Sequence, residues 1–357
     1  MMTRSWILIA LLVGCTKPTD PGAVDASPID DAAIDAPSAM TPALGAALTG
    51  MTVFDGWADP RALAGGVNTP GWEDSAFIAP GGQRLYFGYT RLNFDAVLMG
   101  QGVIDGPHRP DARGDAFDVY ESDLIGTLDT GGWITRVSTM NASGDIPEAA
   151  QAVDRSETTM VFARFVGDAD LYEVGRADRD ATWGTPVELP APVNTPCVED
   201  NPHITAGGDF LVFDSDRADA AGTTCKPSGQ PRDLWIASRI GNGWSAPALV
   251  VGVPNAQPVR FQPFATPAAA ELYWSGFSSD CSPAVSCIHR ANRQLDGSYA
   301  GLALVANTTN PATAADGDVI SIGEISITED GKQMYFIYRQ RISATVSDLS
   351  VGVARRP

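Results

Sequence analysis

The chain is poor in the residues and motifs by which most catalytic sites are recognised. It has only three histidines, His108, His203 and His289, and they lie far apart in the sequence without metal-ligand spacing, which argues against a zinc site. It has no Gly-x-Ser-x-Gly motif, no phosphate-binding glycine loop and no basic stripe with interleaved aromatics. The sequence therefore offers no catalytic residue, and we expect no cofactor and no nucleic-acid partner.

Basic residues are also scarce. The chain has 24 Lys and Arg against 43 Asp and Glu, a formal net charge of −19. A protein this acidic is a poor ligand for nucleic acid and for the surface of an anionic membrane. We take the charge to serve solubility; the alternative is that it attracts basic partners or a divalent cation such as Ca²⁺.

Long apolar runs are missing, and the run from Trp6 to Val13 is too short to span a bilayer. It follows Arg4 and ends in Leu12-Val13-Gly14-Cys15, which resembles the lipobox of bacterial lipoproteins. The resemblance implies that residues 1–15 hold the signal and lipobox and that the signal is cut before Cys15. It also implies that this cysteine is lipidated and that the lipid is the sole contact with the membrane. The alternative is an ordinary signal peptide. Thr16 favours the outer membrane over the inner one.

Residues 16–48 contain no aromatic side chain and are rich in Asp, Ala and Pro. Such a segment cannot bury enough apolar surface to offset the entropy lost on ordering. We expect a disordered tether there, followed by a single folded domain over residues 51–357.

An internal repeat sets the architecture of that domain. Val-Asn-Thr-Pro at residues 67–70 recurs at residues 193–196, and the match continues in register through Ile78 and Ile204. One pattern occurs five times: an apolar or small residue is followed by turn residues and then by an apolar pair. This pattern predicts two strands joined by a tight turn. The apolar pairs are Tyr86-Phe87, Val161-Phe162, Val212-Phe213, Tyr273-Trp274 and Tyr335-Phe336.

Two further repeated motifs complete each unit. An Asp followed by an apolar pair, as in Asp170-Leu171-Tyr172, predicts a third strand, and Asp348-Leu349-Ser350 reads as its weak last copy. Trp-x-x-Pro, as at Trp57 and Trp183, predicts an outermost strand, because proline is confined to sheet edges and bulges. The fold class is therefore all-β: a five-bladed propeller of four-stranded antiparallel blades, closed by the N-terminal strand near Trp57, which completes the last blade.

The repeat resembles the TolB-like, WD-repeat-like propellers of bacterial envelope proteins. The resemblance lies in residues 202–213, from Pro202-His203-Ile204 to Leu211-Val212-Phe213, and in the Asp-Leu-Tyr/Trp strand. It implies a propeller and leaves the function open, since proteins with such repeats serve as scaffolds, binding modules and appendages of enzymes.

In such a propeller, the loop leading into each inner strand (the lead-in loop) and the loop between the second and third strands share one face, the top face. Residues 88–117 form a long loop there, and loops of that length are often functional. Four cysteines predict two disulfides, and the topology favours Cys197–Cys225 and Cys281–Cys287. The candidate ligand-binding residues are Glu73, Asp74, Glu148, Arg164, Glu199, Asp200, His203, Asp214 and Arg217.

Two functions from different classes fit these residues. The first is a non-catalytic, monomeric binding or scaffold module of the envelope that presents its top face to a protein, peptide or glycan. The second is a carbohydrate-active enzyme with carboxylates in the central funnel. Against catalysis, the acids occupy equivalent repeat positions, and no sialidase-type Ser-x-Asp-x-Gly-x-Thr-Trp box is present. The acids could instead cap backbone amides and form salt bridges.

Overall fold

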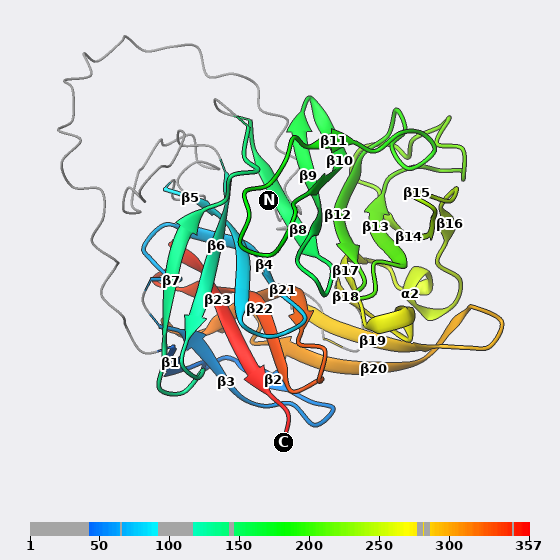
Figure 1. Cartoon of the computed structure of the whole chain (residues 1–357). Helices are drawn as coiled ribbons and strands as arrows, with labels where there is room; N and C mark the ends of the chain where they lie inside the picture. Colours follow the sequence, from blue (N-terminus) through cyan, green and yellow to red (C-terminus); the bar gives the residue numbers. More distant parts are fainter. Residues whose placement is uncertain are drawn as a thin grey trace, which may run out of the picture.

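Five antiparallel sheets are arranged as the blades of a closed propeller in the computed structural model of the chain (Figure 1). The structure describes residues 43–64, 66–91, 117–142, 146–276, 281, 286–344 and 346–357. The inner strands contact one another in the cyclic order β4, β8, β12, β17, β21 and back to β4. The predicted five-bladed, all-β fold is confirmed.

The strands of each blade run outward from the centre in chain order. Blade one has β4 (Trp72–Ile78), β5 (Arg84–Thr90), β6 (Asp118–Ile125) and β7 (Gly132–Val137); blade two has β8 (Glu148–Val153), β9 (Thr159–Val166), β10 (Asp168–Gly175) and β11 (Val187–Glu188); blade three has β12 (Glu199–Ile204), β13 (Phe210–Ser215), β14 (Asp233–Ile240), β15 (Gly243–Trp244) and β16 (Ala248–Leu249). Blade four has β17 (Phe261–Ala265), β18 (Glu271–Gly276), β19 (Cys287–Arg293) and β20 (Tyr299–Thr308), and blade five has β21 (Val319–Ile327), β22 (Gln333–Arg341) and β23 (Ser347–Arg355).

Helix is confined to short pieces among the described residues: α2 (Val253–Ala256) and a 3₁₀ turn at Pro267–Ala269. No described helix combines the length and the apolar character that a membrane crossing needs.

The N-terminal strand closes the ring, as predicted. Strand β3 (Ala58–Leu63) pairs antiparallel with β23, which places the first and last parts of the domain side by side (Figure 1). Trp57, directly before β3, is buried and stacks on Arg356 at 4.3 Å from the ring centroid to the guanidinium carbon.

The folded region begins earlier than the sequence indicated. Strand β1 (Leu44–Ala47) pairs with the outer side of β3, and β2 (Met51–Val53) pairs with β20 of blade four. The expected tether over residues 16–48 is therefore too long at its C-terminal end. Ala43 and Leu48 are buried, so this alanine-rich segment orders because the blade edge supplies both apolar cover and backbone partners.

An asparagine in the lead-in loop clamps the third strand of the preceding blade. Asn141, Asn194 and Asn255 each accept the N–H and donate to the carbonyl of one third-strand residue: Val119, Leu171 and Leu234. Asn68 does the same for Val351 at the ring closure, with the N–H of Val351 donating at 2.7 Å. This contact explains why Val-Asn-Thr-Pro recurs in the sequence.

The clamp also corrects one register. Because Asn68 holds Val351, and Phe336 pairs with Gly352, the repeat position of Asp118 and Asp170 is occupied in blade five by Ser350. Asp348, which the sequence suggested for this position, lies two residues before Ser350 and pairs with Gln340. The aspartate misled because the alternation of buried residues, and not the acid, sets the register.

Each inner strand carries a β-bulge at one repeat position. The bulge residue adopts a left-handed conformation with φ between 49° and 54° in all five blades: Ser75, Ala150, Asn201, Gln262 and Glu324. A bulge re-aims side chains locally, and all five of these residues line the cavity on the propeller axis.

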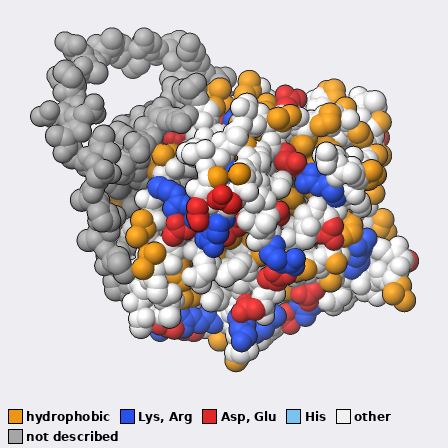
Figure 2. Space-filling view, viewed as in Figure 1, with side chains coloured by type: hydrophobic (Ala, Val, Ile, Leu, Met, Phe, Trp, Pro, Cys, Tyr) orange, Lys and Arg blue, Asp and Glu red, His pale blue; other side chains and the backbone are white. Residues whose placement is uncertain are grey.

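Buried ion pairs join blades one and two. Arg84 of β5 is 2% exposed and donates to Asp123 at 2.5 Å and to Asp180 at 2.7 Å. Arg176 stacks on Trp183, whose indole N–H donates to Glu121 of the neighbouring blade at 2.7 Å. Figure 2 shows Lys and Arg side chains interspersed with Asp and Glu on the face in view, so the net negative charge does not form one continuous acidic surface there.

Candidate functional site

The glutamates at the start of three inner strands are buried braces. Glu73, Glu148 and Glu199 are all 0% exposed. Glu199 accepts hydrogen bonds from the backbone and hydroxyl of Thr195 in the lead-in loop, both at 2.8 Å. Glu73 accepts from the hydroxyl of Thr69 at 2.6 Å in the same arrangement. These carboxylates hold each lead-in loop against its strand, and such a role explains why they recur once per repeat.

Two of the predicted cationic residues serve the same braces. Arg164 donates to Glu148 at 2.9 Å, and Arg217 donates to Glu199 at 2.8 Å. Burial raises the pKa of Glu148 and Glu199, and the adjacent guanidinium opposes that rise in each case. Arg164 lies on the second strand of blade two and Arg217 in the loop after the second strand of blade three, and neither pair lines the axial cavity.

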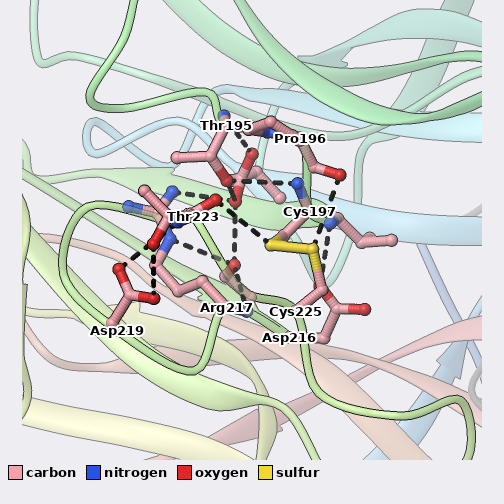
Figure 3. Close-up of a disulfide and its surroundings, with 12 residues drawn as sticks. Thr195, Pro196, Cys197, Asp216, Arg217, Asp219, Thr223 and Cys225 are labelled. Carbon is pink, nitrogen blue, oxygen red and sulfur yellow. Dashed lines mark hydrogen bonds and ion pairs between the residues drawn. A yellow bond between two sulfur atoms is a disulfide. The ribbon is translucent and has the colours of Figure 1, made fainter.

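The Cys197–Cys225 disulfide covers the Arg217 brace. It joins the lead-in loop of blade three to the loop between β13 and β14, as predicted, and Figure 3 shows Arg217 beside it. Arg217 also donates to the carbonyls of Pro192 and Val193. In the same loop, Asp219 accepts from the hydroxyl of Thr223 at 3.0 Å and forms a tight exposed turn. The Cys281–Cys287 bridge is present too.

A second set of acids lies at the top of the propeller axis. The side chains of Asp74 and Glu324, from blades one and five, interact with one another. Burial raises the pKa of both carboxyls, and the neighbouring Asp74 raises that of Glu324 further. Glu324 also accepts from the backbone N–H of Ser75 at 2.5 Å and from the amide of Gln262 at 2.9 Å. One proton shared between the two carboxyls fits these contacts.

One arginine forms ion pairs with both acids of blade three. One nitrogen of Arg232 donates to Asp200 and to Asp214, each at 2.8 Å. Asp214 accepts in addition from the amide of Asn201 at 2.8 Å and from the backbone N–H of Gln262 at 3.0 Å. Asp200 and Asp214 are thus fixed by a cation and by neighbouring amides.

Aromatic side chains close the axis below these acids. His203 lies between Phe77 and Phe264, with ring centroids 5.5 and 4.4 Å from theirs. The cavity above, lined by the bulge residues, has about 40 Å³, and the cavity below has about 20 Å³. The upper cavity has room for a few water molecules and the lower one for about one, and neither approaches the roughly 300–1,000 Å³ of typical small-molecule pockets.

His203 gives the fold a dependence on pH. Its Nε2 donates to the carbonyl of Ala265 at 2.9 Å, and burial lowers its pKa to about 4 from 6.5. The folded state favours the neutral His203 ring, so its contribution to the free energy of unfolding is complete above pH 6.5. This contribution, about 3 kcal/mol, is lost as the pH falls towards 4. We expect the free energy of unfolding of His203→Gln, measured by urea denaturation, to fall less between pH 6.5 and 4 than that of the wild type. The same pH dependence in both proteins would contradict the assignment.

The structure divides the nine candidate residues into two groups. Glu73, Glu148, Arg164, Glu199 and Arg217 form the braces, whereas Asp74, Asp200, His203 and Asp214 lie on or beside the axis. Of the long loop at residues 88–117, residues 92–116 lie outside the described part. Sequence reasoning missed Glu324, Gln262 and Arg232. The first two occupy the repeat position of Ser75, where the five repeats have five different residues, so an alignment of the repeats does not single them out.

Potential metal ligands come together elsewhere among the described residues. The sets of three or more Cys, His, Asp or Glu ligand atoms that lie within 4.8 Å of one another are Cys281, Cys287 and His289, and Cys197, Asp216 and Cys225. Neither set includes an acid of the axis.

Comparison with known proteins gives similarity of fold only. No family model matches the sequence, and no curated protein matches it. Among solved structures, TolB from Acinetobacter baumannii is 10% identical with a TM-score of 0.40, over 78% of this chain and 53% of that chain, so the match spans about half of TolB. The catalytic domain of a GH62 α-L-arabinofuranosidase from Coprinopsis cinerea is 9% identical with a TM-score of 0.49, over 90% and 98%. A protein of unknown function from Dyadobacter fermentans is 11% identical with a TM-score of 0.48, over 86% and 100%.

Proposed function

We propose that the chain is a non-catalytic binding module whose top face takes a protein, peptide or glycan of the cell envelope. The observation that carries this proposal is that the candidate acids are already engaged in contacts within the protein. The three buried glutamates brace the lead-in loops, and Arg232 forms ion pairs with both Asp200 and Asp214. An axial cavity of about 40 Å³ has no room for such a partner, so we place it across the loops of the top face.

Photo-cross-linking in cells tests the proposal, because it captures whatever partner lies against the modified position. A photoreactive residue replaces Asp219 in the β13–β14 loop on the top face, or Asp296 in the β19–β20 turn on the opposite face. The two acids are matched, because both lie in exposed turns and each accepts a hydrogen bond from a nearby hydroxyl, Thr223 or Ser298. We expect adducts from position 219 and none from position 296; adducts from 296 alone would place the binding face at the other end.

The module is anchored, in this proposal, by lipid on Cys15, on the outer membrane rather than the inner one. The support is the lipobox-like sequence at residues 12–15. We expect mass spectrometry of the mature protein to find diacylglycerol on an N-terminal Cys15, and Cys15→Ser to release the domain into the soluble fraction. An unmodified N-terminus downstream of Cys15 would contradict the anchor.

A carbohydrate-active enzyme is the second candidate. The observation that favours it is the Asp74–Glu324 pair, since a carboxyl with a raised pKa is what a general acid requires. Against it, the two carboxyls are in contact, whereas glycosidases separate theirs by roughly 5–10 Å. Hydrolysis of a glycoside that Glu324→Gln abolishes would establish this function.

A further inference from the structure

Blade four departs from the repeat at two positions of its third strand. The position of Asp118, Asp170 and Asp233 is occupied by Cys287, and the aromatic position of Tyr120, Tyr172 and Trp235 is occupied by His289. Both replacements are buried, at 0% and 1% exposure. Three other blades keep the acid and the aromatic, and blade five has Ser350 and Gly352 at these positions. Blade four differs from all of them in that both replacements are potential metal ligands.

A disulfide explains only half of the departure. The Cys281–Cys287 bridge ties the loop before β19 to the strand. At the position clamped by asparagine in the other blades, Ile288 pairs with Ala306 of the long strand β20, so this end of β19 is held by strand pairing and by the disulfide. Neither requires a histidine, and any of the aromatics found in the other blades would fill the position of His289.

His289 is instead placed against the sulfurs. Its Nε2 lies 3.9 Å from the Sγ of Cys281, and the ligand atoms of Cys281, Cys287 and His289 all lie within 4.8 Å of one another. Ligand atoms around a tetrahedral zinc ion are separated by about 3.5–3.8 Å, given Zn–S and Zn–N bonds of about 2.3 and 2.0 Å. Small movements would suffice to bring the three atoms onto one ion.

We propose that, once the Cys281–Cys287 bridge is reduced, Cys281, Cys287 and His289 bind one zinc ion. A dithiol reductant transfers two electrons and two protons to the bridge, becomes a disulfide itself, and leaves two thiols. Zn²⁺ then displaces one proton from each thiol and binds two thiolates and the imidazole Nε2, with one coordination position left for water. This site was not expected from the sequence, because the histidines were compared with one another and not with the cysteines.

The surroundings suit that particular set of ligands. Trp274 stacks on the imidazole at 5.7 Å, and Leu304 packs against both cysteines. An uncompensated charge in such an apolar place is costly. Two thiolates, a neutral imidazole and Zn²⁺ sum to zero charge, so the occupied site needs no further counter-ion, and soft sulfur ligands favour zinc over calcium or magnesium.

Metal titration of the full chain carrying Cys15→Ser, which removes the fifth thiol, tests the proposal. After reduction with dithiothreitol and transfer into an anaerobic phosphine buffer, Co²⁺ is added as a spectroscopic probe, followed by Zn²⁺. We expect one equivalent of Co²⁺ to give a thiolate-to-cobalt band that Zn²⁺ removes, and the unreduced protein to give none. Bound Zn²⁺ should also protect Cys281 and Cys287 from alkylation, as read by peptide mass.

Matched variants locate the site. Cys281→Ser and Cys287→Ser should abolish the band, and His289→Gln should weaken binding at least tenfold. The double variant Cys197→Ser/Cys225→Ser, which removes the other disulfide, should bind as the parent does. The proposal is overturned if the reduced parent gives no band, if His289→Gln binds with unchanged affinity, if the double variant loses binding, or if reduction alone removes the near-ultraviolet circular dichroism of the folded state.

Discussion

Deletion of residues 43–64 is expected to unfold the domain at room temperature, whereas deletion of residues 1–42 should leave its melting temperature unchanged. The longer deletion removes β1 and β3 and so strips blade five of the strands that pair with β23. It also removes Trp57 and Leu63, which are 4% and 2% exposed. Loss of a buried leucine or tryptophan costs about 2–5 kcal/mol each, and these two together are comparable with the whole stability of a typical domain, about 5–15 kcal/mol.

The test is the difference in melting temperature between the two deletion variants, with thermal unfolding monitored by circular dichroism. Trp57→Ala in the intact chain offers a milder version, since it keeps the strand pairing and removes the indole that stacks on Arg356. We expect it to lie between the two deletions, with a loss of about 3–5 kcal/mol. Equal melting of both truncated proteins would mean that the ring does not depend on its N-terminal closure.

Replacement of Arg217 by alanine is the second change with a large expected effect. The residue is 0% exposed and is held by the carboxylate of Glu199 at 2.8 Å and by the carbonyl of Pro192 at 3.0 Å. Its guanidinium also lies over the rings of Phe213 and Trp235, at 5.2 and 5.3 Å from their centroids. Removing it leaves a buried carboxylate without its cation, for which losses of about 3–5 kcal/mol are typical.

Two controls separate the buried pair from a general effect of arginine removal. Arg61→Ala breaks an ion pair with Asp59 in which both side chains are more than a third exposed, and such surface pairs contribute about 0–1 kcal/mol. Glu199→Gln/Arg217→Met removes both charges and should recover part of the stability lost in Arg217→Ala. If urea denaturation gives Arg217→Ala and Arg61→Ala the same midpoint, the brace does not stabilise the domain.

The repeat carried most of the fold prediction, because each of its motifs has a local physical cause. Glycines in the inner turns adopt left-handed conformations, as at Gly82 and Gly208, and prolines after Trp57 and Trp183 mark strands towards the outside of a blade. The ring closure followed from the order of these motifs. Strand β1 did not, because its sequence Leu-Gly-Ala-Ala has little strand propensity of its own and orders only against an existing edge.

The axial site was less accessible from the sequence. Glu324 belongs to it because the bulge in β21 turns that residue towards Asp74 of another blade, and a contact between first strands of different blades leaves no local pattern. The recurring glutamates were conspicuous in the sequence for a structural reason, since each braces its own lead-in loop. Repetition therefore identified the scaffold, and the departures from it, at Glu324 and His289, carry more information about sites.

The measurement that most directly tests whether this propeller is a binding module is a search for hydrolysis by the purified protein. The chain is incubated with a panel of oligosaccharides and aryl glycosides, with and without added Ca²⁺, and the products are read by mass spectrometry beside Asp74→Asn and Glu324→Gln. We predict no product above the level given by the two variants. Turnover of any substrate that falls at least a hundredfold in Glu324→Gln would contradict the binding-module account and make the Asp74–Glu324 pair a catalytic centre.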